Sequence, residues 1–258
     1  MLPYLEIFGQ SFSTYGIIGI AALVIAAATA SLRAKKYNLT LSDILLVTTF
    51  AGGGIFLGGS LLYALVQLPH LSNIIEHTGG SFGDTLSLLF GGMIFYGGLF
   101  GTLLAVAIYA KFMKQDIKNI FRFVIPVFPL AHGIMRLGCF AVGCCYGIEH
   151  STLGLAFTNS PIAPNDTPFI PVQLYESALN FAIFAAIWAY SKKERHPVHL
   201  ICFYAMPYAI GRFALEFLRG DAQRGSIFGI STSQFISIAV LICCTAALIF
   251  TKKRITRS

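Results

Sequence analysis

Four polar residues with helical spacing lie in an otherwise apolar stretch near the carboxyl end of the sequence. Tyr208, Arg212 and Glu216 follow one another at steps of four, and Arg219 follows at a step of three. At about 3.6 residues per turn, all four fall within about 80° on one helix face. An arginine at the centre of a lone membrane helix costs about 2.5–3.5 kcal/mol on insertion scales, so this stripe indicates function. An internal Arg212–Glu216 pair that only fixes helix packing is the alternative.

A second stretch repeats the pattern. His132, Arg136 and Cys139 occupy positions i, i+4 and i+7, again on one helix face, and a glycine-rich segment follows them. Guanidinium groups bind phosphate through paired hydrogen bonds, so two arginine-bearing faces predict a pocket for an anion. In a membrane the obvious phosphate is that of a lipid headgroup.

Three cysteines follow closely on this second arginine. Four roles are possible for Cys139, Cys144 and Cys145: helix packing, a disulfide, direct catalysis or a metal site with the nearby histidines. Their spacing matches no established zinc pattern, so we expect no metal. A bond between the adjacent Cys144 and Cys145 is geometrically poor, which makes Cys139 the better disulfide partner. The other three cysteines lie in apolar segments and behave as small hydrophobes: Cys202, Cys243 and Cys244.

The elements that carry these residues are membrane helices. Of 258 residues, 11% are charged and 56% are apolar, against about 25% and about 45–50% in soluble domains. This composition excludes a disordered chain, a small disulfide-rich domain and an ordinary soluble enzyme. Apolar runs of about 20 residues recur, and each can cross a bilayer core of about 30 Å. We therefore expect an all-α polytopic membrane protein that crosses the membrane seven times, at roughly 14–32, 44–67, 87–110, 121–142, 172–191, 198–218 and 230–251.

Charge predicts the orientation of these spans. No Lys or Arg occurs in 67–110 or 137–191, while basic clusters follow every odd span. Because Lys and Arg stay on the cytoplasmic side, the amino terminus is expected outside and the carboxyl terminus in the cytoplasm. The net charge of +7 therefore needs no nucleic acid partner. The clusters are Arg33, Lys35 and Lys36; Lys111, Lys114, Lys118 and Arg122; Lys192, Lys193 and Arg195; and Lys252, Lys253, Arg254 and Arg257.

Arginines outside those clusters need another explanation. They are expected within or beyond the outer half of the membrane, where the orientation rule disfavours them: Arg136, Arg212, Arg219 and Arg224. The phosphate of a lipid is the explanation that we favour.

One integral-membrane domain is expected over 1–258, with short outer loops at about 68–86, 143–171 and 219–229. Segment 147–171 contains four prolines and reads as irregular chain. The stretch before the first span has Glu6 and no basic residue, so that span is expected to stay rather than to be cleaved as a signal peptide.

Two more groups of residues complete the candidates. The fifth span begins with Gln173, Tyr175 and Glu176. In the third span Tyr96 lies among small residues that allow helices to approach closely, and packing alone is one reading of them: Gly91, Gly92, Gly97, Gly98 and Gly101.

Taken in order, these motifs resemble the bacterial prolipoprotein diacylglyceryl transferase family. The similarity runs from about Tyr15 to Gln234 and includes Thr14–Tyr15–Gly16 and the paired Gly58–Gly59 with Tyr63. The further matching stretches are GGMIFYGGLFG in the third span, MRLGCFAVGCCYG at 135–147, PVQLYE at 171–176, YAIGRFALEFLRGD at 208–221 and GISTSQ at 229–234. Each motif alone is weak, whereas their order across nearly the whole chain is specific.

The resemblance implies a seven-span enzyme of the bacterial cytoplasmic (inner) membrane that needs no cofactor. The family moves a diacylglyceryl group from phosphatidylglycerol to the lipobox cysteine thiol of secreted lipoprotein precursors and releases glycerol phosphate. By motif position, Arg136 and Arg212 look like the essential arginines, with Glu216 beside them and Tyr96 or His132 handling the proton. The remaining candidates bind substrate: Tyr15, Gly98, Cys139, Cys144, Gly147, Gln173, Tyr175, Glu176, Tyr208 and Arg219.

The chain departs from the family pattern at four positions. Tyr96 replaces the usual His of the third span, Ser60 replaces an Arg, and Cys139 and Cys144 replace an Asn and a Glu. A free tyrosine has a pKa near 10 and is a poor base for a thiol, so His132 is the alternative base. Two other functions stay open. One is a divergent phospholipid-using transferase with another acceptor, such as one of its own cysteines, and the other is a non-catalytic lipid-binding protein.

Overall fold

The computed structural model describes residues 1–220, 226–227 and 230–255. The chain divides into two compact units. Unit 1 contains Met1–Ala30 and Phe121–Ser258, and unit 2 contains Ser31–Ile120. The expected outer loop at 219–229 and Arg224 lie largely outside the described residues, as do the last three residues.

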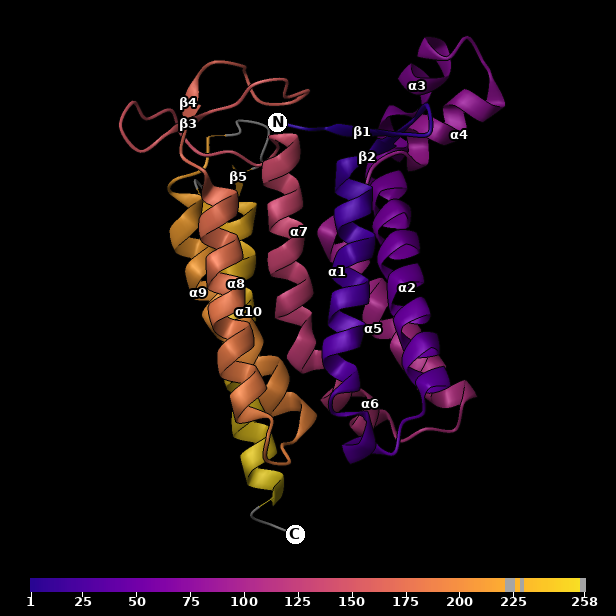
Figure 1. Ribbon diagram of the computed structural model, residues 1–258, viewed down its shortest axis with the longest axis vertical. Helices are drawn as coiled ribbons and strands as arrows, with labels where there is room; N and C mark the ends of the chain where they lie inside the picture. The colour runs from indigo at the N-terminus through magenta and orange to yellow at the C-terminus, as the bar shows by residue number, and fades with distance from the viewer. Residues whose placement is uncertain (221–225, 228–229, 256–258) are drawn as a thin grey trace. The chain divides into compact units, whose positions relative to one another are not determined.

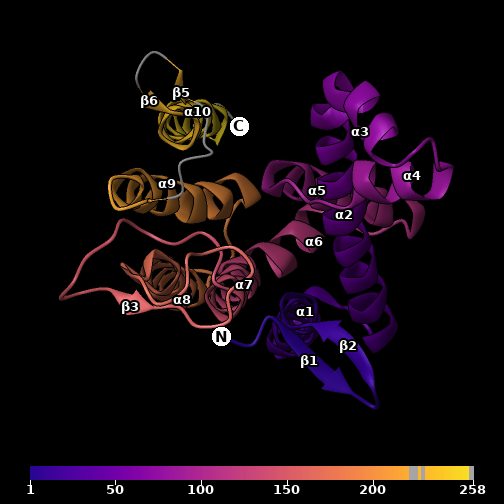
Figure 2. The same ribbon diagram turned by 90° about the horizontal axis from the view of Figure 1, so that it is seen from above.

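Unit 1 is built from long helices that pack in chain order. α7 packs on α8, α8 on α9 and α9 on α10 (Figures 1 and 2). Very short strand pairs lie in its connections. Its elements are β1 Tyr4–Ile7, β2 Gln10–Ser13, α1 Thr14–Ser31, η3 Ile125–Val127, α7 Phe128–Val142, β3 Leu155–Ala156, β4 Pro168–Phe169, α8 Val172–Tyr190, α9 Pro197–Glu216, β5 Ser226–Ile227, β6 Ile230–Ser231 and α10 Thr232–Ile255.

Unit 2 is centred on one helix pair, α2 and α5, which contact each other along their length. Its elements are η1 Ala34–Tyr37, α2 Leu41–Gln67, η2 Leu68–His70, α3 Leu71–His77, α4 Phe82–Phe90 and α5 Phe95–Phe112, and α6 Ile117–Val124 begins in it. The segment expected as a loop at 68–86 thus contains η2, α3 and the start of α4.

Glycines set the distance between α2 and α5. A Cβ atom at Gly54 would lie 2.5 Å from the carbonyl oxygen of Gly101, and one at Gly58 would overlap the backbone of Gly97. The close approach is possible because neither helix has side chains at these positions. The packing role expected for the glycines of the third span is confirmed for Gly97 and Gly101.

Among the described residues, six helical segments are long and apolar enough to cross a membrane, so the chain is a polytopic helical membrane protein. The shorter helix at Tyr96–Phe112 is apolar as well. The third expected span differs from the structure, because α4 ends at Phe90 and α5 begins at Phe95. Between them Ile94 is extended and its amide donates to the carbonyl of Gly59, 3.1 Å away, which draws the chain out of helical geometry.

A hairpin precedes the first long helix, and the sequence reading missed it. β1 and β2 pair antiparallel with Tyr4 opposite Ser13. Phe8 and Gly9 form the turn with φ of 52° and 76°. Two positive φ angles are typical of the tight turns that usually carry Asn-Gly or Gly-Gly. The turn here carries Phe-Gly instead, so its residue types did not predict a hairpin.

Candidate functional site

A fully buried carboxylate joins three helices of unit 1. Glu176, in the second turn of α8, has no exposed surface. Its Oε1 atom lies 2.9 Å from Arg136 Nη2 of α7 and accepts a 2.6 Å hydrogen bond from the hydroxyl of Tyr208 on α9. Three helices therefore meet at one oxygen atom. A buried ion pair of this kind is strongly destabilised when one partner is removed, so these residues fix each other's positions.

His132 lies one turn before Arg136 and belongs to the same group. Its Nδ1 atom is 2.8 Å from the hydroxyl of Tyr204, and its Nε2 atom is 4.0 Å from Glu176 Oε1. Its ring lies 5.0 Å from the ring of Tyr208. The prediction that His132 and Arg136 lie on one face of the helix is thus confirmed. Both side chains are directed toward the carboxylate of Glu176.

Local contacts between α7 and α8 make this approach possible. Ser177 donates from its hydroxyl to the carbonyl of Gly133 at 2.8 Å. A Cβ atom at Gly133 would lie 2.7 Å from the ring of Phe181, so only glycine fits there without a shift. Asn180, also fully buried, donates from its side chain to the carbonyl of Glu176 at 2.8 Å. The Ser177–Gly133 hydrogen bond and the missing side chain at Gly133 let α8 approach α7 closely enough for Glu176 to reach Arg136.

The second arginine has partners of its own. Arg212 Nη1 lies 2.6 Å from Glu216 Oε2 on the same helix, and its Nη2 donates to Ser233 Oγ of α10 at 3.0 Å. The internal pair that the sequence left as an alternative is therefore made. It does not account for the whole stripe, because Tyr208 bonds Glu176 instead.

Arg219 departs from the predicted stripe. α9 ends at Glu216, so Arg219 lies beyond the helix. Its backbone forms an isolated antiparallel bridge with Gly147. A Cβ atom at Gly147 would lie 2.6 Å from the carbonyl of Leu218 and 2.7 Å from that of Ile170. Gly147 thus has a plain packing reason to be glycine, because three chain segments meet at it.

Gln173 and Tyr175 have different surroundings. Gln173 is fully buried and its Nε2 donates to the carbonyl of Cys144 at 2.7 Å, which ties the start of α8 to the segment after α7. The side chain of Tyr175 is exposed. Tyr15, in the first turn of α1, lies beside α7, since a Cβ atom at Gly138 would be 3.5 Å from its ring. Tyr15 and Gln173 therefore both lie near the carboxyl-terminal end of α7.

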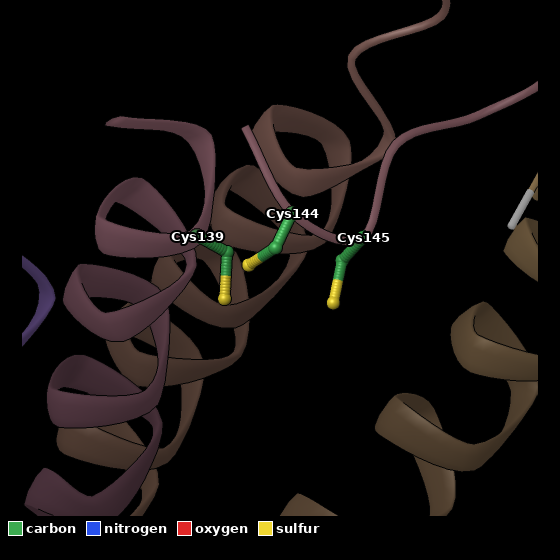
Figure 3. Close-up of side chains that lie close together, drawn as sticks. All are labelled: Cys139, Cys144 and Cys145. Atoms are coloured by element: carbon green, nitrogen blue, oxygen red, sulfur yellow. The ribbon is translucent and has the colours of Figure 1, made fainter. Parts of the chain in front are cut away.

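The three neighbouring cysteines come together in space. Their Sγ atoms all lie within 4.8 Å of one another, and their thiols are free. Figure 3 shows Cys139 on the last turns of α7 and Cys144 and Cys145 on the chain that leaves it, with the three sulfurs directed to the same side. The guanidinium of Arg136 lies 3.9 Å from Cys139 Sγ. Hydrogen bonds from the thiols of Cys139 and Cys144, followed by the charge of Arg219, lower the pKa of Cys145.

Two candidates lie in unit 2. Tyr96 and Gly98 are in the first turn of α5. A Cβ atom at Gly98 would lie 3.2 Å from the carbonyl of Ile55 on α2. Ser60 is buried on α2.

Sequence reasoning missed Tyr204, Ser233 and Asn180. A signal existed for Tyr204, which precedes Tyr208 by four residues and so extends the polar stripe by one turn. Asn180 likewise follows Glu176 by four residues on α8. Ser233 lies on a different helix from Arg212, and no spacing within one helix reveals such a partner.

Some polar atoms of the site make no hydrogen bond within the described residues. They are buried and belong to three neighbouring side chains: Arg136 Nε, Gln173 Oε1 and Glu176 Oε2. A buried polar atom left without a partner costs about 1–3 kcal/mol, so such atoms call for an explanation. Hydrogen bonds to a bound polar ligand are one explanation.

Comparison with known proteins identifies the family. The family described as prolipoprotein diacylglyceryl transferase matches residues 3–250. A phosphatidylglycerol–prolipoprotein diacylglyceryl transferase of Clostridium tetani is 35% identical over 245 residues, which cover 94% of each chain. The second such transferase of Clostridium perfringens is 34% identical over 243 residues, covering 92% of this chain and 90% of its own. The enzyme of Chlorobaculum tepidum is 30% identical over 262 residues, covering 96% and 89%. With matches of this extent, the chain belongs to the prolipoprotein diacylglyceryl transferase family.

Proposed function

We propose that this protein transfers the diacylglyceryl group of phosphatidylglycerol to the lipobox cysteine thiol of a secreted lipoprotein precursor. The thiol sulfur attacks the glycerol carbon that carries the phosphate, so a C–S bond forms and a C–O bond breaks. Glycerol phosphate leaves with the electron pair of the broken bond, and the thiol proton passes to a base. Family membership over nearly the whole chain is the observation that carries this function.

The buried arginines are suited to the departing phosphate. Negative charge grows on the phosphate as the C–O bond breaks, and fixed donors in a site without water stabilise such charge strongly. Arg136 and Arg212 keep their guanidinium groups in place through Glu176, Glu216 and Ser233. A phosphate can bind the guanidinium edges that these partners leave, including Arg136 Nε. In this proposal Arg136 and Arg212 bind the phosphate and Glu216 orients Arg212.

His132 is the base that the geometry favours. A neutral imidazole can accept the proton of a thiol, and Tyr204 and Glu176 fix its ring at 2.8 Å and 4.0 Å. Tyr96 replaces the residue that the family uses in this region and is the alternative proton acceptor. A tyrosine needs a neighbour that lowers its pKa from about 10 before it can do this.

The remaining candidates would hold the lipid and the acceptor peptide. Buried polar groups on α8 and α9 come from Gln173, Glu176 and Tyr208. At the carboxyl-terminal end of α7, or shortly after it, lie Cys139, Cys144 and Gly147. Tyr15 lies beside α7, and Tyr175, Gly98 and Arg219 complete the proposed set.

We further propose seven crossings of the bacterial inner membrane within one domain, with the amino terminus outside. The helix at Tyr96–Phe112 would be the added crossing. α10 ends at the end of unit 1 that lies opposite the β1–β2 hairpin, as this orientation requires (Figure 1). Reporter fusions after Lys114 and after Asn165 check it: a periplasmic phosphatase should be active only at the second position.

Transfer is tested directly with purified protein. The protein is mixed with phosphatidylglycerol and a lipobox peptide, and the peptide mass is measured. We expect an increase by one diacylglyceryl group, lost when the lipobox cysteine of the peptide is changed to serine and in an Arg136→Ala variant. Absence of any peptide adduct with folded protein would overturn the function. An adduct on the protein itself that disappears in Cys139→Ser or Cys144→Ser would identify an internal acceptor instead.

Complementation gives the same answer in cells. The chain is expressed in bacteria depleted of their own transferase, beside Arg136→Ala and Arg212→Ala variants. We expect growth with the natural sequence and none with either variant at equal protein levels.

A further inference from the structure

The three-cysteine cluster makes and breaks no bond in the proposed transfer, although Cys139 and Cys144 are among the proposed substrate-binding residues. Cys139 lies in the last turn of α7, and Cys144 and Cys145 follow in the segment that leaves it. Any two of the three sulfur atoms lie within 4.8 Å of each other. Three sulfurs around one metal ion at about 2.3 Å would be separated by about 4 Å, so a small inward movement of the side chains would close such a site.

Backbone geometry at this turn directs the thiols together. In an extended chain, adjacent side chains point to opposite sides. Here Gly143 ends α7 with φ of 79°, and Cys145 itself has φ of 63°. A residue other than glycine in this left-handed region costs about 1–2 kcal/mol. That conformation lets the neighbouring Cys144 and Cys145 direct their sulfurs to the side where Cys139 already lies (Figure 3).

Charge and access suit a metal that prefers thiolates. The guanidinium of Arg136 lies 3.9 Å from Cys139 Sγ. Cations of this kind favour the deprotonated thiol that a metal requires. Cys139 is buried while Cys144 and Cys145 are half-buried, so an ion can reach the cluster from the side of the loop.

We propose that Cys139, Cys144 and Cys145 form a binding site for one soft cation of the copper(I) class, held by three sulfur ligands. Thiolates select copper(I) and zinc over harder ions, and structural zinc sites require four ligands. In the part of the chain that the structure describes, the group contains three metal-ligating residues. Copper(I) is stable with three thiolates, and its binding displaces the protons of the thiols without any change of oxidation state. Copper(I) binding is measured without phosphatidylglycerol or peptide, so its outcome does not depend on whether transfer occurs.

The test uses the reduced full-length protein in detergent, without oxygen, titrated with copper(I) against a chromogenic copper(I) chelator. We expect one copper(I) per chain at the cluster and an X-ray absorption spectrum with three sulfur neighbours. Each of Cys139→Ser, Cys144→Ser and Cys145→Ser should weaken binding by at least about tenfold and reduce the sulfur neighbours to two. The triple variant should lose the site.

A matched control removes the other three cysteines. Cys202 and Cys244 lie close together, since Cys202 Sγ is 3.6 Å from the carbonyl of Cys244, and they could bind copper(I) as a pair. The Cys202→Ala, Cys243→Ala, Cys244→Ala variant should therefore keep the three-sulfur spectrum. Two sulfur neighbours in the unaltered protein, no binding, or loss of binding in this control would each overturn the proposal. The spectrum of the unaltered protein answers the question even if a serine variant fails to fold.

Discussion

Arg136 and Glu176 form a buried ion pair between α7 and α8, with 2.9 Å between Nη2 and Oε1. The carboxylate has no exposed surface, and Tyr208 donates a further hydrogen bond to the same oxygen. The position of the proposed phosphate-binding arginine therefore depends on a carboxylate from the next helix. This pair should affect both the stability of the protein and the rate of transfer. Variants of Glu176 and Arg136 can distinguish the two effects.

Removing the charge of Glu176 should damage both properties. A Glu176→Gln variant leaves the guanidinium of Arg136 buried beside a neutral amide, and breaking a buried pair costs about 3–5 kcal/mol. We expect a clearly lower melting temperature. At temperatures where the variant is still folded, transfer should be at least about tenfold slower than in the natural protein. Thermal unfolding in detergent and initial rates measure the two effects. Glu149→Gln, an exposed change in the loop after α7, should leave both unchanged.

Replacing Arg136 by lysine should reduce the rate more than the stability. Lysine keeps the charge opposite Glu176 but lacks the planar fork that binds a phosphate through two bonds. Loss of one stabilising donor of this type costs about 10²–10³ in kcat. Initial rates with phosphatidylglycerol and a lipobox peptide give the measurement. Arg195→Lys, in the connection between α8 and α9, serves as the control, and equal rates for the two variants would contradict a phosphate role for Arg136.

Tyr204 should act as a positioning residue for His132. A Tyr204→Phe variant removes the hydroxyl that lies 2.8 Å from Nδ1 and leaves the ring packing in place. We expect kcat to fall by about tenfold with little change in KM, and the pH dependence of kcat to shift, if His132 accepts the proton. Tyr190→Phe is the matched control, because that ring stacks on Phe203 away from the site. An unchanged pH profile in Tyr204→Phe would favour Tyr96 as the base.

The approach of α2 and α5 in unit 2 can be tested by melting temperature alone. A Gly58→Ala change forces its methyl group into the backbone of Gly97, whereas Gly53 on the same helix has nothing within 4 Å. Overpacking of this kind costs about 1–3 kcal/mol, so Gly58→Ala should lower the melting temperature by several degrees. Gly53→Ala should leave it unchanged or slightly higher, because alanine favours helix. Equal melting temperatures for the two variants would argue against the close contact of α2 and α5.

Much of the site follows from helical spacing. The steps between His132 and Arg136, and between Tyr204 and Tyr208, place each pair on one face whatever the rest of the fold does. Spacing could not predict that Arg219 leaves the stripe, because the end of α9 at Glu216 depends on backbone bonds to the segment around Gly147. It could not predict the break at 91–94 either, where Ile94 bonds the backbone of α2.

The sequence by itself determined that this is a helical membrane protein of a particular family, because low charge, long apolar runs and ordered motifs are properties of the chain alone. It also determined which faces carry arginine. Only the tertiary structure decided which groups share a bond: that Glu176 pairs with Arg136, that Ser233 bonds Arg212, and that three cysteines meet. Such contacts join different helices or follow from a left-handed turn, and no periodicity along a single helix specifies them.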